Sequence, residues 1–297
     1  MAAASFDLQA HRGGRGLAPE NTLAAFRQAL ALGVTTLETD LGITRDGVVV
    51  LSHERRLNPD LVRDTDGKWV EPPGPTIHSL TLDTLRRYDI GRLNPATRYG
   101  QQFPGQKPAD GERFPTLAEL YALGGDKVRF NIETKIDPTR PDETVEPAVF
   151  AKLVVDAVRA AKMEKRTTIQ SFDWRTLVHA RSMAPDIDTV CLTIESQNMN
   201  TVAGKPSPWL AGLDVTHGGS LQELAKAADC AVWSPFWRNV TVEAVTAAHA
   251  LGLQVVPWTV NDPAEMARLI DLKVDGLITD YPDRGLAVLA GRGLKSR

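Results

Sequence analysis

The sequence predicts an α/β fold, a TIM-like (β/α)₈ barrel with a cap subdomain inserted after the hairpin of the second strand. Three observations lead to this prediction. Short β-rich runs alternate with helical stretches along most of the 297 residues, which is typical of a parallel sheet. Nine strands are predicted, and an Asp-Gly turn explains the ninth as the return strand of a hairpin outside the eight-stranded barrel. Polar residues of catalytic type follow several predicted strands, where barrel enzymes carry their active sites.

The predicted strands are short apolar runs rich in β-branched residues. They are Phe6–Ala10, Thr36–Asp40, Val48–Leu51, Val128–Glu133, Thr167–Gln170, Thr189–Thr193, Ala231–Ser234, Gln254–Thr259 and Gly276–Thr279. Asp46-Gly47 is a strong signal for a two-residue loop, and such a loop joins only antiparallel neighbours. Val48–Leu51 therefore returns along the second strand, and the other eight strands form the barrel.

Helices are predicted between most of these strands. They fall near Thr22–Leu32, Val145–Ala161, Trp174–Met183, Leu221–Ala227, Val242–Leu251 and Ala264–Leu272. Three have start signals, namely Asn21-Thr22, Asp173 and Asp262-Pro263. A doubly wound sheet is the alternative, but no Gly-x-Gly-x-x-Gly motif follows a strand here.

Residues 55–115 interrupt the alternation and are rich in Pro, Gly, Arg and Asp, with one predicted helix at Leu82–Tyr88. A loop of this length inside a compact domain is usually a functional lid or a small subdomain. Because it starts beside His53, we expect a cap over the active site of a single domain spanning residues 1–297.

Three carboxylates are predicted to converge. Glu38 and Asp40 are two residues apart and share one face of their strand, and Glu133 ends another strand. A two-residue loop at Asp46-Gly47 would also place His53 opposite Asp40. A metal site formed by carboxylates, with no cysteine ligand, suits one hard cation, Mg²⁺ or Ca²⁺. The alternative is a polar strand face, but apolar neighbours such as Leu37, Leu41 and Ile132 indicate inner strands.

His11 and His53 lie at strand ends beside this cluster, and such a pair can divide the general-base and general-acid roles. A single histidine is more often structural. Arg12 and Lys135 are expected to hold an anion such as phosphate, the alternative being ion pairs with the same carboxylates. Trp258 is expected to line the site.

Composition excludes some partners. With a net charge of −3 and no basic run, nothing favours nucleic acid or an anionic membrane, and no apolar stretch could span a bilayer. The first seven residues lack the features of a signal peptide, so a cytoplasmic location is expected, while a periplasmic or secreted one stays open if a leader was removed. Cys191 and Cys230 are expected to be small buried hydrophobes, with a disulfide left open.

The sequence resembles the glycerophosphodiester phosphodiesterase family, and the resemblance spans nearly the whole chain outside the insertion at residues 55–115 and a second, shorter insertion from Glu195 to about Gly219. It is carried, in the family's order, by Ala10-His11-Arg12-Gly13, Pro19-Glu20-Asn21-Thr22, Glu38-Thr39-Asp40, Thr44-Arg45-Asp46-Gly47, Asn131-Ile132-Glu133-Thr134-Lys135, Gln170-Ser171-Phe172, Trp258-Thr259-Val260-Asn261 and Asp275-Gly276-Leu277-Ile278-Thr279-Asp280-Tyr281-Pro282-Asp283.

This resemblance implies a TIM-like barrel that hydrolyses small-molecule glycerophosphodiesters to glycerol phosphate and an alcohol, with one divalent cation. It implies Glu38, Asp40 and Glu133 as metal ligands, His11 and His53 as catalytic histidines, and Arg12 and Lys135 as phosphate contacts. Two departures concern the surroundings of the site. The family usually has His-Asp where this chain has His53-Glu54, and Lys where it has Arg45.

Several alternatives stay open. A lysophospholipase D-like phosphodiesterase would need an acyl groove in the cap, whereas a non-catalytic phosphodiester-binding protein would need no second histidine. A sugar-phosphate isomerase on a plain barrel is the third alternative. His11 is the favoured base and His53 the favoured acid. The sequence leaves open the head group, the choice between Mg²⁺ and Ca²⁺, the oligomeric state, and whether glycerol hydroxyl or water attacks phosphorus.

Overall fold

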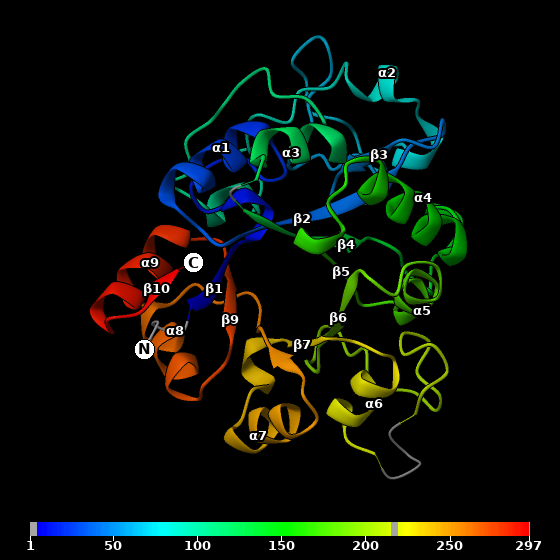
Figure 1. The fold of residues 1–297 in the computed structure, drawn as a ribbon. Helices are drawn as coiled ribbons and strands as arrows, with labels where there is room; N and C mark the ends of the chain where they lie inside the picture. The colour runs from blue at the N-terminus through cyan, green and yellow to red at the C-terminus, as the bar shows by residue number, and fades with distance from the viewer. Residues whose placement is uncertain (1–4, 127, 215–218, 297) are drawn as a thin grey trace.

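Parallel strands curl around the centre of the molecule and helices lie outside them, as Figure 1 shows for the computed structural model. The structure describes residues 5–126, 128–214 and 219–296. The barrel-like strands are β1 (Ser5–Ala10), β2 (Thr36–Ile43), β4 (Arg129–Thr134), β5 (Thr167–Ser171), β6 (Asp188–Thr193), β7 (Val232–Pro235), β8 (Gln254–Val255) and β9 (Gly276–Thr279). These bounds agree with the predicted strands to within a few residues, except for β8, and confirm the α/β class.

Each of these strands pairs in parallel with its neighbour in the order β9, β1, β2, β4, β5, β6, β7, β8. At the end of β8 and just after it, backbone bonds run from the amide of Asp275 to the carbonyl of Val255 (2.9 Å) and from the amide of Ile278 to the carbonyl of Pro257 (3.0 Å). These bonds join the last part of the sheet to β9. A two-residue strand, β10 (Lys295–Ser296), pairs with the start of β1.

Helices lie between most of the strands. They are α1 (Leu23–Leu32), α2 (Leu82–Leu85), α3 (Leu117–Gly124), α4 (Pro147–Ala160), α5 (Trp174–Met183), α6 (Leu221–Ala227), α7 (Val242–Ala250), α8 (Pro263–Asp271) and α9 (Pro282–Gly291). The side chains of Thr22, Asp173 and Asp262 accept hydrogen bonds from backbone amides of the first turns of α1, α5 and α8, as predicted. Each such cap stabilises its helix by about 1 kcal/mol.

Two helices were not predicted, although both carry signals. A capping box precedes α3, where Thr116 and Glu119 satisfy each other's backbone amides. Pro282 occupies the first turn of α9, the position that proline favours. The predicted helix at Leu82–Tyr88 is a single turn, Leu82–Leu85.

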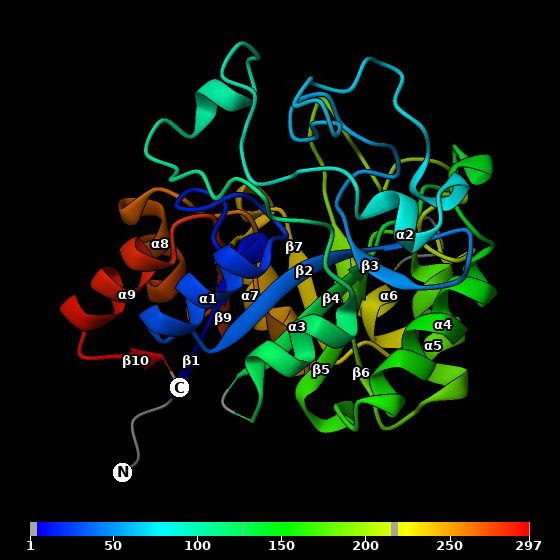
Figure 2. The same ribbon diagram turned by 90° about the horizontal axis from the view of Figure 1, so that it is seen from above.

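The segment between β3 (Val49–Leu51) and α3 lies at one end of the curled sheet, as the view in Figure 2 shows. It has a small apolar core of its own, formed with β3 by Val50, Leu57, Val62, Ile77, Leu85, Ile90 and Phe114. Ion pairs add to this core, since Arg63 bonds to both Asp89 (2.8 Å) and Asp110 (2.6 Å).

The hairpin between β2 and β3 has a different register from the predicted one. Leu41 pairs with Leu51 and Ile43 with Val49, and the amide of Ser52 donates to the carbonyl of Asp40 (2.9 Å). Asp40 therefore lies opposite Ser52, so the predicted pairing with His53 is wrong. The reason is a three-residue loop, Arg45 to Gly47, closed by a bond from the amide of Gly47 to the carbonyl of Thr44 (3.0 Å). Gly47 adopts φ +78°, which glycine permits without strain.

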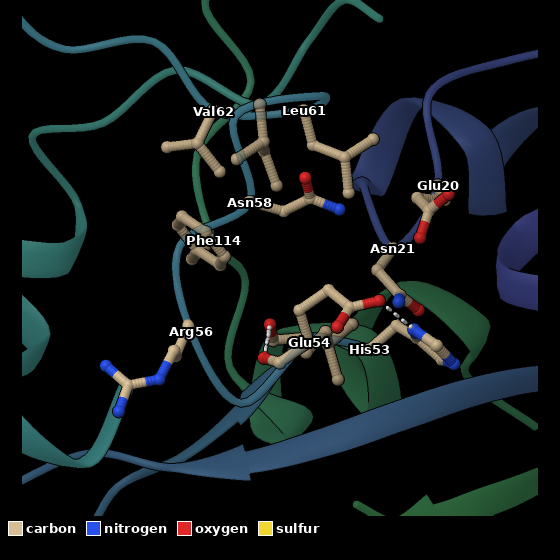
Figure 3. A pocket seen from close by; sticks show the side chains of 12 residues that line it. Glu20, Asn21, His53, Glu54, Arg56, Asn58, Leu61, Val62 and Phe114 are labelled. Carbon is tan, nitrogen blue, oxygen red and sulfur yellow. Dashed lines mark hydrogen bonds and ion pairs between the residues drawn. The ribbon is translucent and has the colours of Figure 1, made fainter. Parts of the chain in front are cut away.

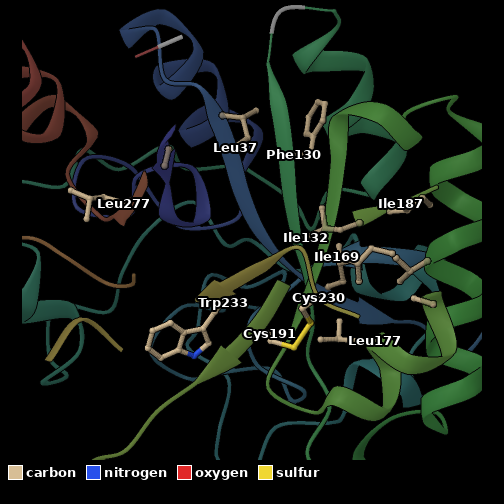
Figure 4. Packing of buried hydrophobic residues seen from close by; sticks show 14 of the residues in the cluster. Leu37, Phe130, Ile132, Ile169, Leu177, Ile187, Cys191, Cys230, Trp233 and Leu277 are labelled. Atoms are coloured by element: carbon tan, nitrogen blue, oxygen red, sulfur yellow. A yellow bond between two sulfur atoms is a disulfide. The ribbon is translucent and has the colours of Figure 1, made fainter. Parts of the chain in front are cut away.

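The main core packs the outer faces of the strands against the helices (Figure 4). Within it, Cys191 and Cys230 form a disulfide with a Cα–Cα distance of 5.9 Å. Both are buried, as predicted, but they do not act as two separate small hydrophobes. The pairing arises because β6 and β7 are neighbours, which brings two residues 39 apart in sequence together.

Candidate functional site

Three buried carboxylates meet where β2 and β4 lie side by side. Asp40 is the register partner of Glu133, and Glu38 precedes Asp40 by two residues on the same strand. Ligand oxygens of the three residues all lie within 4.8 Å of one another. Their exposed fractions are 1% for Glu38, 1% for Asp40 and 6% for Glu133. The predicted convergence of the three carboxylates is therefore what the structure shows.

Arg12 and Lys135 contact this cluster directly. Arg12 Nε lies 3.1 Å from Asp40 Oδ2, and its Nη1 donates to Glu20 Oε1 (2.7 Å). Lys135 Nζ lies 2.7 Å from Glu133 Oε1 and 3.8 Å from Asp40 Oδ1. Both cations thus make the ion pairs that the sequence left as the alternative to anion binding. They also line the same pocket as the histidines, which puts their outer surfaces within reach of a ligand.

The carboxylates carry more negative charge than these two cations neutralise. Burial and the nearby charge of Asp40 raise the pKa of Glu38 well above its usual range. Burial also raises the pKa of Glu133 to about 7, with Asp40 adding to the effect against Lys135. Burial acts in the same direction on Asp40, but Arg12, His53 and Lys135 outweigh it and hold the pKa of that carboxyl far below its usual range.

These features fit a divalent cation. Asp40 Oδ1 is a buried oxygen that has no hydrogen-bond partner among the described residues, and it belongs to the same cluster. A cation among the three carboxylates would reduce the repulsion between them and would give Asp40 Oδ1 the partner that it lacks. An all-oxygen ligand set suits Mg²⁺ or Ca²⁺ better than Zn²⁺. The buried triad is therefore a group that could bind a metal ion.

His11 lies directly after β1, and its partner comes from the other end of the chain. Its Nδ1 lies 2.6 Å from Asp280 Oδ1, and Asp280 follows β9, the strand beside β1. Asn261 Nδ2 donates to the other oxygen of Asp280 (2.7 Å). Burial and the charge of Arg15 lower the pKa of His11 to about 4 against the opposing effect of Asp280. His11 is thus a neutral imidazole at pH 7.

His53 follows β3 and pairs with the next residue in the chain. Its Nδ1 lies 2.8 Å from Glu54 Oε1, the contact dashed in Figure 3. Burial, followed by the charges of Arg12 and Lys135, lowers the pKa of His53. Glu54 stands where the family usually has Asp, and the 2.8 Å contact shows that its longer side chain still reaches the ring nitrogen.

The two histidines share one arrangement. Each has Nδ1 on a carboxylate, which fixes the Nδ1–H tautomer and leaves Nε2 as the nitrogen available for proton transfer. Both line a pocket with an empty volume of about 430 Å³, open to solvent. It is lined by His11, Arg12, Arg15, Glu38, His53, Glu133, Lys135, Gln170, Phe172, Leu192, Trp258, Thr259 and Ile278. All predicted site residues except Asp40 contribute to its wall.

Trp258 is among these wall residues, as expected from the sequence. Its indole Nε1 donates to the carbonyl of Ser234 (3.0 Å), and its ring packs edge-to-face against Phe172 at 5.2 Å between centroids. Lys135 Nζ lies 5.8 Å from the centre of the Phe172 ring. The aromatic pair therefore forms an apolar side of the pocket next to a cation.

Sequence reasoning missed the groups that support the site. Asp280 and Glu54 hold the histidines, Arg15 lines the pocket, and Glu20 pairs with Arg12. Asn21 Nδ2 donates to Asp40 Oδ2 (3.1 Å). Glu20, Asn21 and Asp280 lie within motifs that carried the family resemblance, and Asn21 was also predicted as part of a helix start signal, but none of them was predicted to contact the carboxylates or the histidines.

A chain of buried amides below the carboxylates ends on Glu38. Gln170 Nε2 donates to Glu38 Oε1 (2.6 Å), and Asn131 Nδ2 donates to Gln170 Oε1 and to Gln9 Oε1 (both 2.9 Å). Gln9 Nε2 then donates to Asp7 Oδ2 (2.8 Å). Each amide fixes the orientation of the next, so Glu38 is held in place as a hydrogen-bond acceptor.

We expect Asn131→Asp to lower the free energy of unfolding by about 2 to 6 kcal/mol, since it removes two buried donors and faces two carbonyl oxygens with a carboxylate. Urea denaturation measures the change. Thr168→Val is the control, because it removes only the hydroxyl that donates to Asn131 Oδ1 (2.9 Å) and should cost much less. Equal stability of Asn131→Asp and the wild type would show that the row of buried amides does not stabilise the fold.

Comparisons with known proteins agree over nearly the whole chain. The model of the "Glycerophosphoryl diester phosphodiesterase family" matches residues 11–284. The chain is 30% identical over 275 residues to a glycerophosphodiester phosphodiesterase of Caldanaerobacter subterraneus subsp. tengcongensis, covering 92% of this chain and 93% of that protein. It is 29% identical over 278 residues to a Bacillus subtilis protein of the same name, covering 92% and 83%.

Solved structures are similar as well. A putative glycerophosphoryl diester phosphodiesterase from Silicibacter pomeroyi has a TM-score of 0.89 at 34% identity, covering 100% of this chain and 97% of that one. A phosphodiesterase from Oleispira antarctica, solved with the product sn-glycerol-3-phosphate, shares the fold with a TM-score of 0.71 at 24% identity, covering 96% of both chains.

The fold, the site and these matches define an enzyme of the phosphoric diester hydrolase class. The chain belongs to the glycerophosphoryl diester phosphodiesterase family. Within the described residues, every helix is too short or too polar to cross a membrane.

Proposed function

We propose that this enzyme hydrolyses glycerophosphodiesters to glycerol 3-phosphate and an alcohol, with one divalent cation and a histidine pair. The observation that carries the proposal is the pocket in which His11 and His53, each with Nδ1 on a carboxylate, lie beside three buried carboxylates. The names of the relatives support the substrate class. The product bound to the Oleispira antarctica phosphodiesterase agrees with it.

Glu38, Asp40 and Glu133 would hold the cation, Mg²⁺ or Ca²⁺, whose charge would polarise a phosphoryl oxygen. Arg12 and Lys135 would neutralise the remaining charge of the phosphodiester. Because they are already ion-paired with carboxylates, their side chains are ordered before substrate binds. Trp258 would form the apolar wall against the glycerol carbons.

The histidines would divide the proton transfers. His11, neutral at Nε2, is the proposed base that takes the proton from the attacking hydroxyl, either of glycerol beside the phosphoester or of water. A new P–O bond forms as the bond to the alcohol breaks, and His53 gives its proton to the leaving alkoxide. Burial, Arg12 and Lys135 lower the pKa of His53, whereas Asp40 and Glu54 favour the charged form that this role needs. If glycerol attacks, the cyclic phosphate is then opened by water.

We also propose the finer architecture expected from the sequence. The eight parallel strands would form one complete (β/α)₈ barrel, and residues 55–115 would act as a cap. The backbone bonds between residues 255–260 and β9 support closure of the barrel. The location of residues 55–115 at the end of the barrel that carries His53 supports a cap.

Cation affinity is expected to fall as the pH drops below 7. A carboxyl with a raised pKa holds a proton below that pKa, and the proton must leave before a cation binds. Because the pKa of Glu133 is about 7 and that of Glu38 is raised as well, affinity should fall at least roughly tenfold per pH unit below pH 7. Calorimetric titration of Mg²⁺ or Ca²⁺ between pH 5.5 and 8.5 measures this. An affinity independent of pH would exclude Glu133 as a ligand.

A substrate panel tests the function. Glycerophosphocholine, glycerophosphoethanolamine and glycerophosphoglycerol should each release glycerol 3-phosphate when Mg²⁺ or Ca²⁺ is present. Detergent-dispersed lysophosphatidylcholine should be a poor substrate. Preference for the lysophospholipid would replace the proposal with a lysophospholipase D-like activity, and binding of glycerophosphodiesters without turnover would indicate a non-catalytic binding protein.

A further inference from the structure

Arg15 reaches the catalytic pocket from the loop after β1. Its Nε donates to Asp280 Oδ1 (2.7 Å), the oxygen that also bonds to His11 Nδ1. Two glycines in the left-handed region, Gly13 (φ +83°) and Gly14 (φ +88°), turn the chain so that the side chain points back over the end of β9. Arg15 lines the same pocket as both histidines.

The inserted segment holds this arginine from the other side. Arg15 Nη1 donates to the hydroxyl of Tyr99 (2.9 Å), and that hydroxyl in turn bonds to Glu20. The guanidinium carbon lies 5.2 Å from the centre of the Phe103 ring, and Gln106 Nε2 donates to the carbonyl of Arg15 (2.6 Å). The side chain of Arg15 is only 16% exposed. Residues 99–106, far along the chain, therefore fix its position.

The three cations of the pocket differ in how fully their charge is matched. Arg12 faces both Glu20 and Asp40, and Lys135 faces Glu133 with Asp40 further away. Among the described residues, Arg15 makes one ion pair, with a carboxylate that it shares with His11 and Asn261. Its hydrogen bonds to described side chains use Nε and Nη1, so Nη2 has no such partner within residues 5–126, 128–214 and 219–296. A guanidinium held at two nitrogens beside an open pocket is preorganised for an anionic oxygen.

We propose that Arg15 binds an anionic oxygen of the substrate's phosphodiester, as a third cationic contact beside Arg12 and Lys135, and that Tyr99 and Phe103 are its positioning residues. The inference rests on the proposed function. In this proposal residues 99–106 do more than cover the pocket. They position a substrate-binding group, Arg15, on the His11 side of the pocket. The competing role is structural, in which Arg15 only neutralises Asp280.

Phosphate affinity separates these roles, because it needs no turnover. Inorganic phosphate is titrated into the cation-loaded enzyme by calorimetry for the wild type, Arg15→Gln, Arg15→Lys and Tyr99→Phe. We expect Arg15→Gln to weaken phosphate binding about tenfold or more, Arg15→Lys to recover part of the loss, and Tyr99→Phe to lose less. Cation affinity and thermal unfolding, recorded for each variant, identify any loss of the folded site.

Arg63→Gln is the matched control. Arg63 is 17% exposed, pairs with Asp89 (2.8 Å) and Asp110 (2.6 Å) and lies 5.6 Å from the centre of the Trp69 ring, so it resembles Arg15 in burial and in its ion-pair and aromatic contacts but lies outside the pocket. Phosphate affinity within twofold of the wild type for both Arg15→Gln and Arg63→Gln would overturn the proposal. An equal loss in both would overturn it too, because a general charge or stability effect would then explain the result.

The pH profile supplies a second readout. The charge of Arg15 lowers the pKa of His11, so Arg15→Gln should move the acid limb of kcat/KM to higher pH. An unmoved limb would contradict the placement of Arg15 beside the base. If no glycerophosphodiester is hydrolysed while Arg15→Gln still loses phosphate binding, the proposed function fails and the anion contact stands.

Discussion

His11→Ala and His53→Ala are each expected to lower kcat for glycerophosphocholine by about 10² to 10⁴-fold, which is the usual contribution of one positioned acid or base. This corresponds to about 3 to 5 kcal/mol of transition-state stabilisation. We expect both variants to fold, because each imidazole bonds through Nδ1 to a carboxylate beside an open pocket. Steady-state release of glycerol 3-phosphate measures the loss.

A substrate with an activated leaving group assigns the two roles. In the p-nitrophenyl ester of glycerol phosphate the leaving group departs as p-nitrophenolate, a stable anion that needs no acid, so His53→Ala should recover most of its activity on this substrate. His11→Ala should not recover, because the attacking hydroxyl still needs a base. The reverse pattern would exchange the two roles. Circular dichroism and cation titration serve as controls, and near wild-type turnover of glycerophosphocholine by either variant would remove that histidine from the mechanism.

Asp40→Asn is expected to weaken cation binding by at least about 100-fold and to abolish turnover, since changes around metal ligands typically cost 10 to 100-fold already. Asp40 is the member of the triad that stays ionised, held by Arg12 and Lys135, whereas Glu38 and Glu133 have raised pKa values. Asp40→Asn therefore removes the one carboxylate of the triad that is ionised before a cation binds. Calorimetry gives the affinity, and glycerol 3-phosphate release gives the rate.

Glu143→Gln is the matched control for this variant. Glu143 is a carboxylate of low exposure that pairs with Arg55 (2.8 Å) and Arg56 (3.0 Å), and it lies outside the catalytic pocket. Its replacement removes a charge of the same kind without touching the triad. If Asp40→Asn bound Mg²⁺ and Ca²⁺ as the wild type does, the cation would have to lie elsewhere.

The sequence was most informative where local rules apply. Period-two spacing put Glu38 and Asp40 on one face, and apolar neighbours identified β2 and β4 as inner strands that bring Glu133 alongside. Helix caps at Thr22, Asp173 and Asp262 were predictable because a cap involves residues only two or three apart.

Prediction failed where several local structures fit one sequence. Asp46-Gly47 suits a two-residue loop and equally a three-residue loop with glycine in the left-handed region, and the structure has the second. The register shifts by one residue as a result. His53 nevertheless reaches the pocket, because β3 ends at Leu51 and the chain turns before His53.

Long-range partners were the other gap. Asp280 is 269 residues from His11, and only the pairing of β9 with β1 brings them together. Arg15 was not assigned to the site from the sequence, since nothing in the sequence links it to Tyr99 in the insertion. The Cys191–Cys230 disulfide likewise depends on the order of strands in the sheet.

Removal and return of the cation tests the central claim most directly. The enzyme is treated with chelator, dialysed, and assayed for glycerol 3-phosphate release from glycerophosphocholine before and after Mg²⁺ or Ca²⁺ is added. We predict that activity is lost on chelation and restored by one equivalent of the preferred cation in the wild type, but not in Asp40→Asn. Full activity of the chelated enzyme would contradict a metal-dependent mechanism at this site.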